Sequence, residues 1–234
     1  DSLFAQVDEV VRSSKDLLVF WQDLISLWRD MLVVKATPKA AAYLDLTDSE
    51  EGLRQVMKAR VFGVMPWGKL YRREIFEGVV YPEKTIAEDA YVIVPLMEHC
   101  RKVAFSTAQK YYYVHRRESL TTSGFRWSDL GSVEVWDHNQ NVVEERHPAL
   151  KKEAGVRCCW ARFFVLDKLM LLETMDAEKK ALAKRLAKEL KKHPLLVLEG
   201  DHFTNGRKIA YLTLFLGTGI YRQCVRALFR KRNL

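Results

Sequence analysis

The chain has 234 residues, of which 48% are hydrophobic and 11% aromatic, so it can bury a core and is not a disordered or low-complexity protein. Its net charge of +8 favours acidic partners: phosphorylated substrates, nucleic acid or an anionic membrane surface. Residues 1–60 carry a net charge of −2 and residues 61–234 carry +10, so the basic character belongs to the later part.

The cysteine pattern and the hydropathy indicate the cellular compartment in which the protein is expected. Its four cysteines show no Cys-x-x-Cys spacing, which argues against a zinc site and a disulfide framework and favours a reducing compartment. The longest run without a charged residue, Ile209 to Tyr221, has 13 residues, whereas a membrane span needs about 20. The acidic stretch Asp1 to Glu9 does not resemble a signal peptide. We expect a cytoplasmic protein, with peripheral attachment to the inner membrane face as an option.

Residues 1–58 have the periodicity of a helical bundle. Apolar residues recur at three- and four-residue steps over residues 2–34, with a break at Ser13 to Asp16, which predicts two helices. We expect a third helix to begin at Pro38, because proline is favoured at the first position of a helix. The stretch Thr47 to Glu50 offers a cap and first-turn acids, so we expect a fourth helix that runs to about Lys58.

The rest of the chain divides in two. Residues 59–128 are rich in glycine and proline and contain strand-like segments at Val79 to Tyr81 and Lys102 to Phe105. Residues 129–234 are helical again, with a break at His147-Pro148, a lysine-rich helix over residues 177–192 and a last helical stretch over residues 207–232 with a basic end. The predicted fold class is therefore α+β and mostly helical.

Ordered motifs in the middle region point to one chemistry. They are Met65 to Arg73, which contains Trp-Gly-Lys, then Ile75 to Gly78, Tyr81 to Glu83, Ala87 to Ala90 and Tyr111 to Thr121. In order and spacing they resemble the second half of family 2 glycosyltransferases of the GT-A fold, over about residues 60–234. The resemblance implies a partial GT-A acceptor-side domain of an inverting enzyme. Such an enzyme moves a sugar from a nucleotide-sugar donor to a hydroxyl acceptor in cell-surface polysaccharide or glycolipid synthesis.

Two adjacent acids are the candidate catalytic residues. Inverting transfer needs a general base that takes the proton of the attacking hydroxyl. Glu88 and Asp89 begin a predicted helix, whose dipole helps to keep them ionised. The resemblance places the base at Asp89, with Glu88 orienting the acceptor or the base. The alternative is that both acids serve only as favourable charges at a helix start.

The resemblance also implies four substrate-binding residues. Trp67 would form part of the sugar or acceptor wall, Lys69 would support phosphate or the local loop, and Arg116 with Ser119 would match an Arg-x-x-Ser element at the leaving diphosphate. Trp67 as a core anchor and Lys69 as surface charge are the alternatives.

Family members hold Mg²⁺ or Mn²⁺ through an Asp-x-Asp-type motif in the donor-binding half, and no such motif precedes Trp67. We therefore assign no metal ligand, and expect the donor-binding half to be missing and the chain to be inactive by itself.

We also expect the basic tail to lie on an anionic membrane that carries lipid-linked acceptors, or else to be a packed helix with a solvated edge. Nucleic-acid binding has only charge in its favour and is not expected.

A second resemblance covers residues 1–58. Stretches such as Phe4 to Val11, Asp23 to Ile25 and Trp28 to Leu32 are similar to the collar domain of the DNA polymerase III gamma/tau subunit. This implies a non-enzymatic assembly module that binds clamp-loader subunits, without ATPase activity because no Walker A motif occurs. A generic helical bundle is the alternative. With both resemblances in one sequence, we expect a chimeric or truncated chain, or a fusion whose halves fold separately.

Overall fold

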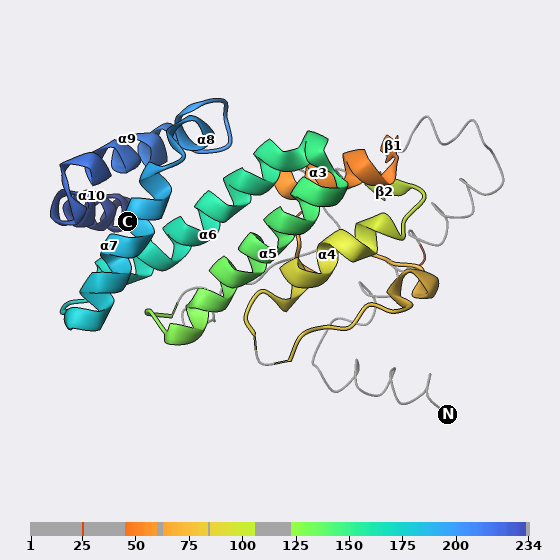
Figure 1. Ribbon diagram of the computed structural model, residues 1–234, viewed down its shortest axis with the longest axis horizontal. Coiled ribbons are helices and arrows are strands. Elements are labelled where there is room, and N and C mark those ends of the chain that lie inside the picture. Colours follow the sequence, from red (N-terminus) through yellow and green to blue (C-terminus); the bar gives the residue numbers. More distant parts are fainter. Residues whose placement is uncertain (1–24, 26–44, 60–62, 84, 106–122, 233–234) are drawn as a thin grey trace. The chain divides into compact units, whose positions relative to one another are not determined.

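The computed structural model describes residues 25, 45–59, 63–83, 85–105 and 123–232, coloured in Figure 1. The chain divides into two compact units, one of residues 1–47 with 102–112 and one of residues 48–101 with 113–234. In the first unit, strand β1 (Asp45–Thr47) pairs antiparallel with β2 (Val103–Phe105), with Asp45 opposite Phe105. The strand predicted at residues 102–105 is thereby confirmed. Apart from Ile25, the helices predicted before Asp45 lie outside the described residues.

The second unit is built from helices, which confirms the mostly helical fold class. Among its described residues before position 150, the α-helices are α3 (Ser49–Lys58), α4 (Glu88–Glu98) and α5 (Gly131–Arg146). They are followed by α6 (Lys151–Leu171), α7 (Ala177–Lys191), α8 (Pro194–Leu198), α9 (Asn205–Thr213) and α10 (Thr218–Arg232). Short 3-10 helices join them: η2 (Arg73–Phe76), η3 (Trp127–Leu130), η4 (Pro148–Leu150) and η5 (Leu214–Leu216). In Figure 1, α4, α5 and α6 lie side by side.

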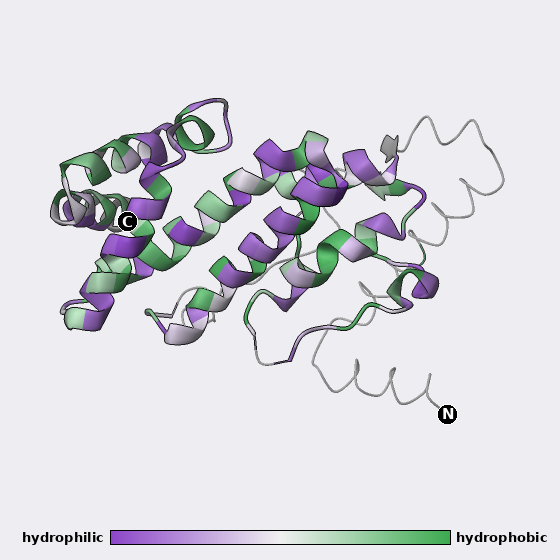
Figure 2. Ribbon diagram, viewed as in Figure 1, coloured by the Kyte–Doolittle hydropathy of each residue, from purple (hydrophilic) through white to green (hydrophobic). Residues whose placement is uncertain are grey.

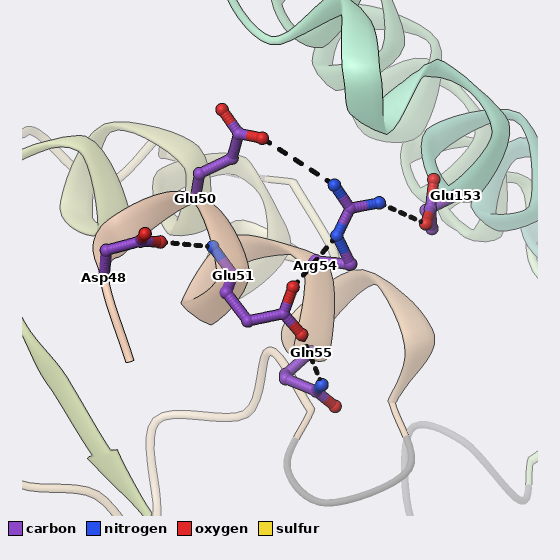
Figure 3. Close-up of polar contacts among 6 residues, drawn as sticks. All are labelled: Asp48, Glu50, Glu51, Arg54, Gln55 and Glu153. Carbon is purple, nitrogen blue, oxygen red and sulfur yellow. Dashed lines mark hydrogen bonds and ion pairs between the residues drawn. The ribbon is translucent and has the colours of Figure 1, made fainter. Parts of the chain in front are cut away.

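Helix α3 begins where the sequence predicts. The Asp48 carboxylate accepts a hydrogen bond from the Glu51 backbone N–H at 2.8 Å, and acids occupy the first turn. Arg54 then joins α3 to α6, because its guanidinium donates to Glu51 at 3.0 Å and to Glu153 at 2.8 Å (Figure 3). From α6, Arg157 donates to the Val56 carbonyl at 2.9 Å. The helix at the end of the first 58 residues thus belongs to the same compact unit as α6.

The largest core of the described residues surrounds α6. Hydrophilic and hydrophobic residues alternate along α5, α6 and α7 (Figure 2), as expected for helices that bury one face. Leu166 and Leu169 of α6 are fully buried together with Leu190 of α7 and Tyr221 of α10. A polar link lies beside them: the Asp167 carboxylate accepts hydrogen bonds from the Tyr221 hydroxyl at 2.5 Å and the Arg207 guanidinium at 3.0 Å.

One sequence prediction about regular structure was wrong. Residues Val79 to Tyr81 form no strand; instead Val79 packs against the apolar cluster that contains Ile75. The helical stretch predicted over residues 207–232 is confirmed by α9, η5 and α10, with a break between η5 and α10 where Gly217 adopts a φ of 121°. A glycine readily takes this backbone conformation and ends helical continuity.

Some of the basic residues near the end of the chain make hydrogen bonds within the fold. Arg222 of α10 donates to the Met170 carbonyl at 3.1 Å and to the Glu173 carbonyl at 2.8 Å. Arg226 donates to the Leu172 carbonyl at 2.8 Å. These carbonyls lie at the end of α6, where backbone acceptors lack partners within the helix. Two of the tail arginines therefore cap a neighbouring helix.

Candidate functional site

The candidate site lies at the start of α4, where Glu88 and Asp89 form the first turn. The residue before them, Ala87, has a φ of 69°, in the left-handed region that alanine rarely occupies. Behind the two acids, Ala90, Val92 and Ile93 are buried, so packing holds α4 against the rest of its unit. Strained backbone of this kind persists where surrounding structure enforces it, and it is frequent at functional sites.

Helix α5 fixes the first turn of α4 in place. The Asn139 side-chain amide, which is buried, donates to the Ala90 carbonyl at 2.6 Å. The rings of His138 and Tyr91 stack with centroids 4.9 Å apart and an interplanar angle of 14°. Gly131 brings the backbone of α5 so close that a methyl group there would lie 2.7 Å from the Thr85 hydroxyl. The backbone next to Asp89 therefore has little freedom to move.

The carboxyl group of Asp89 is half-buried and electrostatically perturbed. Burial raises the pKa of Asp89 above its ordinary value, and the charge of Glu88 acts in the same direction. The Ala90 backbone N–H, 2.7 Å from the carboxylate, and the charge of Lys69 oppose this shift. Glu88 itself is exposed. The two acids thus occupy different environments, and the desolvated one is the stronger candidate for proton transfer.

Three further side chains are coupled to these acids. Burial lowers the pKa of Lys69, and the charge of Asp89 partly offsets this effect. Burial raises the pKa of Tyr71 to about 12, with Asp89 as one of the contributing charges. Burial also raises the pKa of Tyr81, to which Asp89 and Glu88 both contribute. A lysine and two tyrosine hydroxyls therefore lie within electrostatic range of Asp89.

The segment that carries Lys69 and Tyr71 is anchored on α4. Ile75 of η2 is buried against Val92 and Leu96 of α4, and Tyr71 packs against the same cluster. The imidazole Nδ1 of His99, just after α4, lies 2.7 Å from the Ile75 carbonyl oxygen. The irregular chain between residues 63 and 83 is thus held beside the start of α4 by a small apolar cluster.

The structure brings three of the six predicted site residues together: Lys69, Glu88 and Asp89. Trp67 lies two residues before Lys69 and is 38% exposed. Arg116 and Ser119 lie outside the described residues.

Two residues that sequence reasoning did not assign to the site are Tyr71 and Tyr81. Both lie in the ordered motifs of the middle region, Met65 to Arg73 and Tyr81 to Glu83, so their place in these motifs could have identified them as site residues. Asn139 carries no such signal, because it contacts the site from a helix 49 residues away.

Within the described ranges, no group of three or more His, Cys, Asp or Glu side chains could hold a metal ion. No helix in that same part of the chain is long and apolar enough to cross a membrane. Comparison of the chain with protein-family models, with curated proteins and with solved structures finds no match. The candidate site combines a desolvated carboxylate, an exposed carboxylate, a lysine and two tyrosines.

Proposed function

We propose that the chain carries the acceptor-side half of an inverting, family 2-type glycosyltransferase, with Asp89 as the general base. The observation that carries this proposal is the position of the Asp89 carboxylate, which is half-buried at the fixed start of α4 within electrostatic range of Lys69. Burial there raises the pKa of Asp89. A carboxylate that binds a proton more strongly than usual is better suited to deprotonating a sugar hydroxyl. The exposed position of Glu88 suits contact with the acceptor.

In this mechanism, Asp89 takes the proton of the acceptor hydroxyl while the oxygen attacks the anomeric carbon of the donor sugar. The bond from that carbon to the diphosphate oxygen breaks, and the nucleoside diphosphate leaves from the opposite face. Lys69, together with Arg116 and Ser119, stabilises the charge that develops on the diphosphate. Trp67 offers its exposed indole to the apolar face of a sugar ring.

The nucleotide-sugar and the Mg²⁺ or Mn²⁺ that accompanies its diphosphate belong, in this proposal, to the donor-binding half. In this proposal the chain supplies the base, the acceptor side and the positive charge of Lys69 near the leaving diphosphate. The lipid-linked acceptors used in polysaccharide or glycolipid synthesis would bring the chain to the inner membrane face, and the net charge of +8 supports binding to an anionic surface.

The test is the variant Asp89→Asn in a protein that joins this chain to a donor-binding half. We expect acceptor-dependent release of nucleoside diphosphate to fall by about 10²- to 10⁴-fold, because the amide cannot accept the proton. Glu77→Gln, which changes an exposed carboxylate at the end of η2, is the matched control and should retain activity. Unchanged turnover in the Asp89→Asn protein, with the helical circular dichroism preserved, would discard Asp89 as the base.

The clamp-loader hypothesis concerns residues 1–58, of which the structure describes Ile25 and residues 45–58. It therefore stays a prediction. A pull-down of clamp-loader subunits with the full chain tests it, and absence of capture would leave residues 1–58 as a generic helical bundle.

A further inference from the structure

An exposed apolar edge lies at the junction of α9, η5 and α10. Phe215 and Leu216 are 52% and 71% exposed, although the residues around them in sequence, Tyr211 and Leu214, are fully buried. The buried pair anchors the junction in the core, and Phe215 rests edge-on against Tyr211 with ring centroids 5.4 Å apart. Four exposed residues make up this feature, which we name the η5 edge: Leu212, Phe215, Leu216 and Ile220.

Three lysines of α7 stand beside the η5 edge. Lys184, Lys188 and Lys191 are spaced four and three residues apart, which puts them on one face of the helix. Together with Ala187, Gly217 and Thr218 they line a shallow hollow of about 330 Å³. The ammonium group of Lys191 lies 5.5 Å from the centroid of the Phe215 ring, so the cationic and apolar groups are neighbours.

The chain segment that carries the η5 edge has charge of one sign. No acidic residue follows Asp201 in the sequence, and the first turn of α10 contains none. Arg222 and Arg226 donate to carbonyls at the end of α6, so they contribute less to an outward-facing surface than the sequence suggested. The α7 lysines therefore provide the cationic face at this position.

We propose that this face docks on an anionic lipid bilayer, with Phe215 and Leu216 inserted among the lipids and the α7 lysines on the headgroup phosphates. Exposed apolar side chains flanked by lysines match the layered chemistry of a bilayer, where acyl chains lie directly beneath anionic groups. A soluble anion would satisfy the lysines but leave the η5 edge in water. The inference deepens the proposed function by naming the surface that would bring the chain to lipid-linked acceptors.

The test is co-sedimentation of the full chain with vesicles of phosphatidylcholine alone and with one-quarter phosphatidylglycerol. We expect binding to the anionic vesicles alone, and weaker binding as salt rises. Replacing Lys184, Lys188 and Lys191 by glutamine should weaken the partition on the order of a hundredfold, since each lysine near an anionic surface contributes about fivefold. The double variant Phe215→Ser, Leu216→Ser should also lose on the order of a hundredfold, because two apolar side chains stay in water.

The matched control replaces Lys151, Lys152 and Lys180 by glutamine, which removes the same charge from exposed lysines that do not line the hollow. It should bind nearly as well as the original chain, with all variants checked by circular dichroism. Equal loss in this control, or no anionic-vesicle binding by the original chain, would overturn the proposal. So would binding of inorganic phosphate or duplex DNA without vesicle binding. The Asp89→Asn protein should still bind vesicles, so this result and the transferase result are independent.

Discussion

The second unit contains two regions of different construction. Helices α6 to α10 share one large apolar core, in which Leu166, Leu169 and Tyr221 are fully buried. In the described residues 63–83 and 85–87 the regular structure is the short helix η2, and this segment rests on α4 through the small cluster around Ile75. The candidate catalytic groups lie on the second region and at its end. The comparison indicates that stability comes from the first region, while the second keeps polar and strained residues that a tightly packed core excludes.

A matched pair of core truncations tests this division most strongly. Leu169 belongs to the large core and Leu96 to the small cluster, and both are buried. We expect Leu169→Ala to lower the free energy of unfolding by about 4 kcal/mol and Leu96→Ala by about 2 kcal/mol, because the irregular segment over Leu96 can relax into the space. Urea unfolding followed by circular dichroism measures both. Equal losses, or a larger loss for Leu96→Ala, would contradict the division.

Two alanines in the left-handed region provide a smaller test. Ala59 ends α3 with a φ of 48°, and Ala87 precedes α4 with a φ of 69°. Glycine removes the steric cost at both positions, so Ala59→Gly and Ala87→Gly should each stabilise the fold by about 0.5 to 1 kcal/mol. If the proposed transferase function holds, Ala87→Gly, unlike Ala59→Gly, should lower transfer in a protein that joins this chain to a donor-binding half, because it loosens the turn that presents Glu88 and Asp89. Identical activities of the two variants would show that the left-handed backbone at Ala87 has no role in catalysis.

The smallest effect concerns the pH dependence of stability. The pKa of Asp89 is raised in the folded state, so ionisation of this group opposes folding. Below the unfolded pKa of about 3.9 the carboxyl is protonated in both states, so it does not affect stability. As pH rises from the unfolded pKa to the higher folded pKa, the unfolded chain loses this proton first and the cost to stability grows; it is complete above the folded pKa. Asp89→Asn should therefore gain stability over the original chain between pH 4 and pH 7. A difference that stays constant over this range, measured by urea unfolding, would contradict the assigned shift.

Local signals in the sequence predicted much of the helical framework. The cap at Asp48, the lysine-rich helix of residues 177–191 and the start of α4 at Glu88 all follow from neighbours within one or two turns. The strand at Val79 to Tyr81 failed because β-branched residues alone do not make a strand, which needs a paired neighbour. Gly217 was missed as a break because a lone glycine is tolerated within many helices.

Lys69, Glu88 and Asp89 could be predicted as candidate site residues from the sequence, because they lie in motifs that follow one another in a fixed order and spacing. The contacts that hold them come from elsewhere in the chain and have no local signature. Asn139 reaches Ala90 across 49 positions, and Arg226 reaches Leu172 across 54. Pairings of this kind are decided by how helices pack, so the residues that position the site and those that cap α6 are visible only in three dimensions.

The attachment of α10 has a practical consequence for protease digestion. Cleavage of the peptide bond at Gly217 would separate α10 from the preceding chain, yet Tyr221 would still hydrogen-bond Asp167, and Arg222 and Arg226 would still cap α6. The cut protein should therefore run as one particle in gel filtration and as two bands after denaturation. Such a chain is suited to reconstitution from two separately made fragments, with α10 supplied as a synthetic peptide.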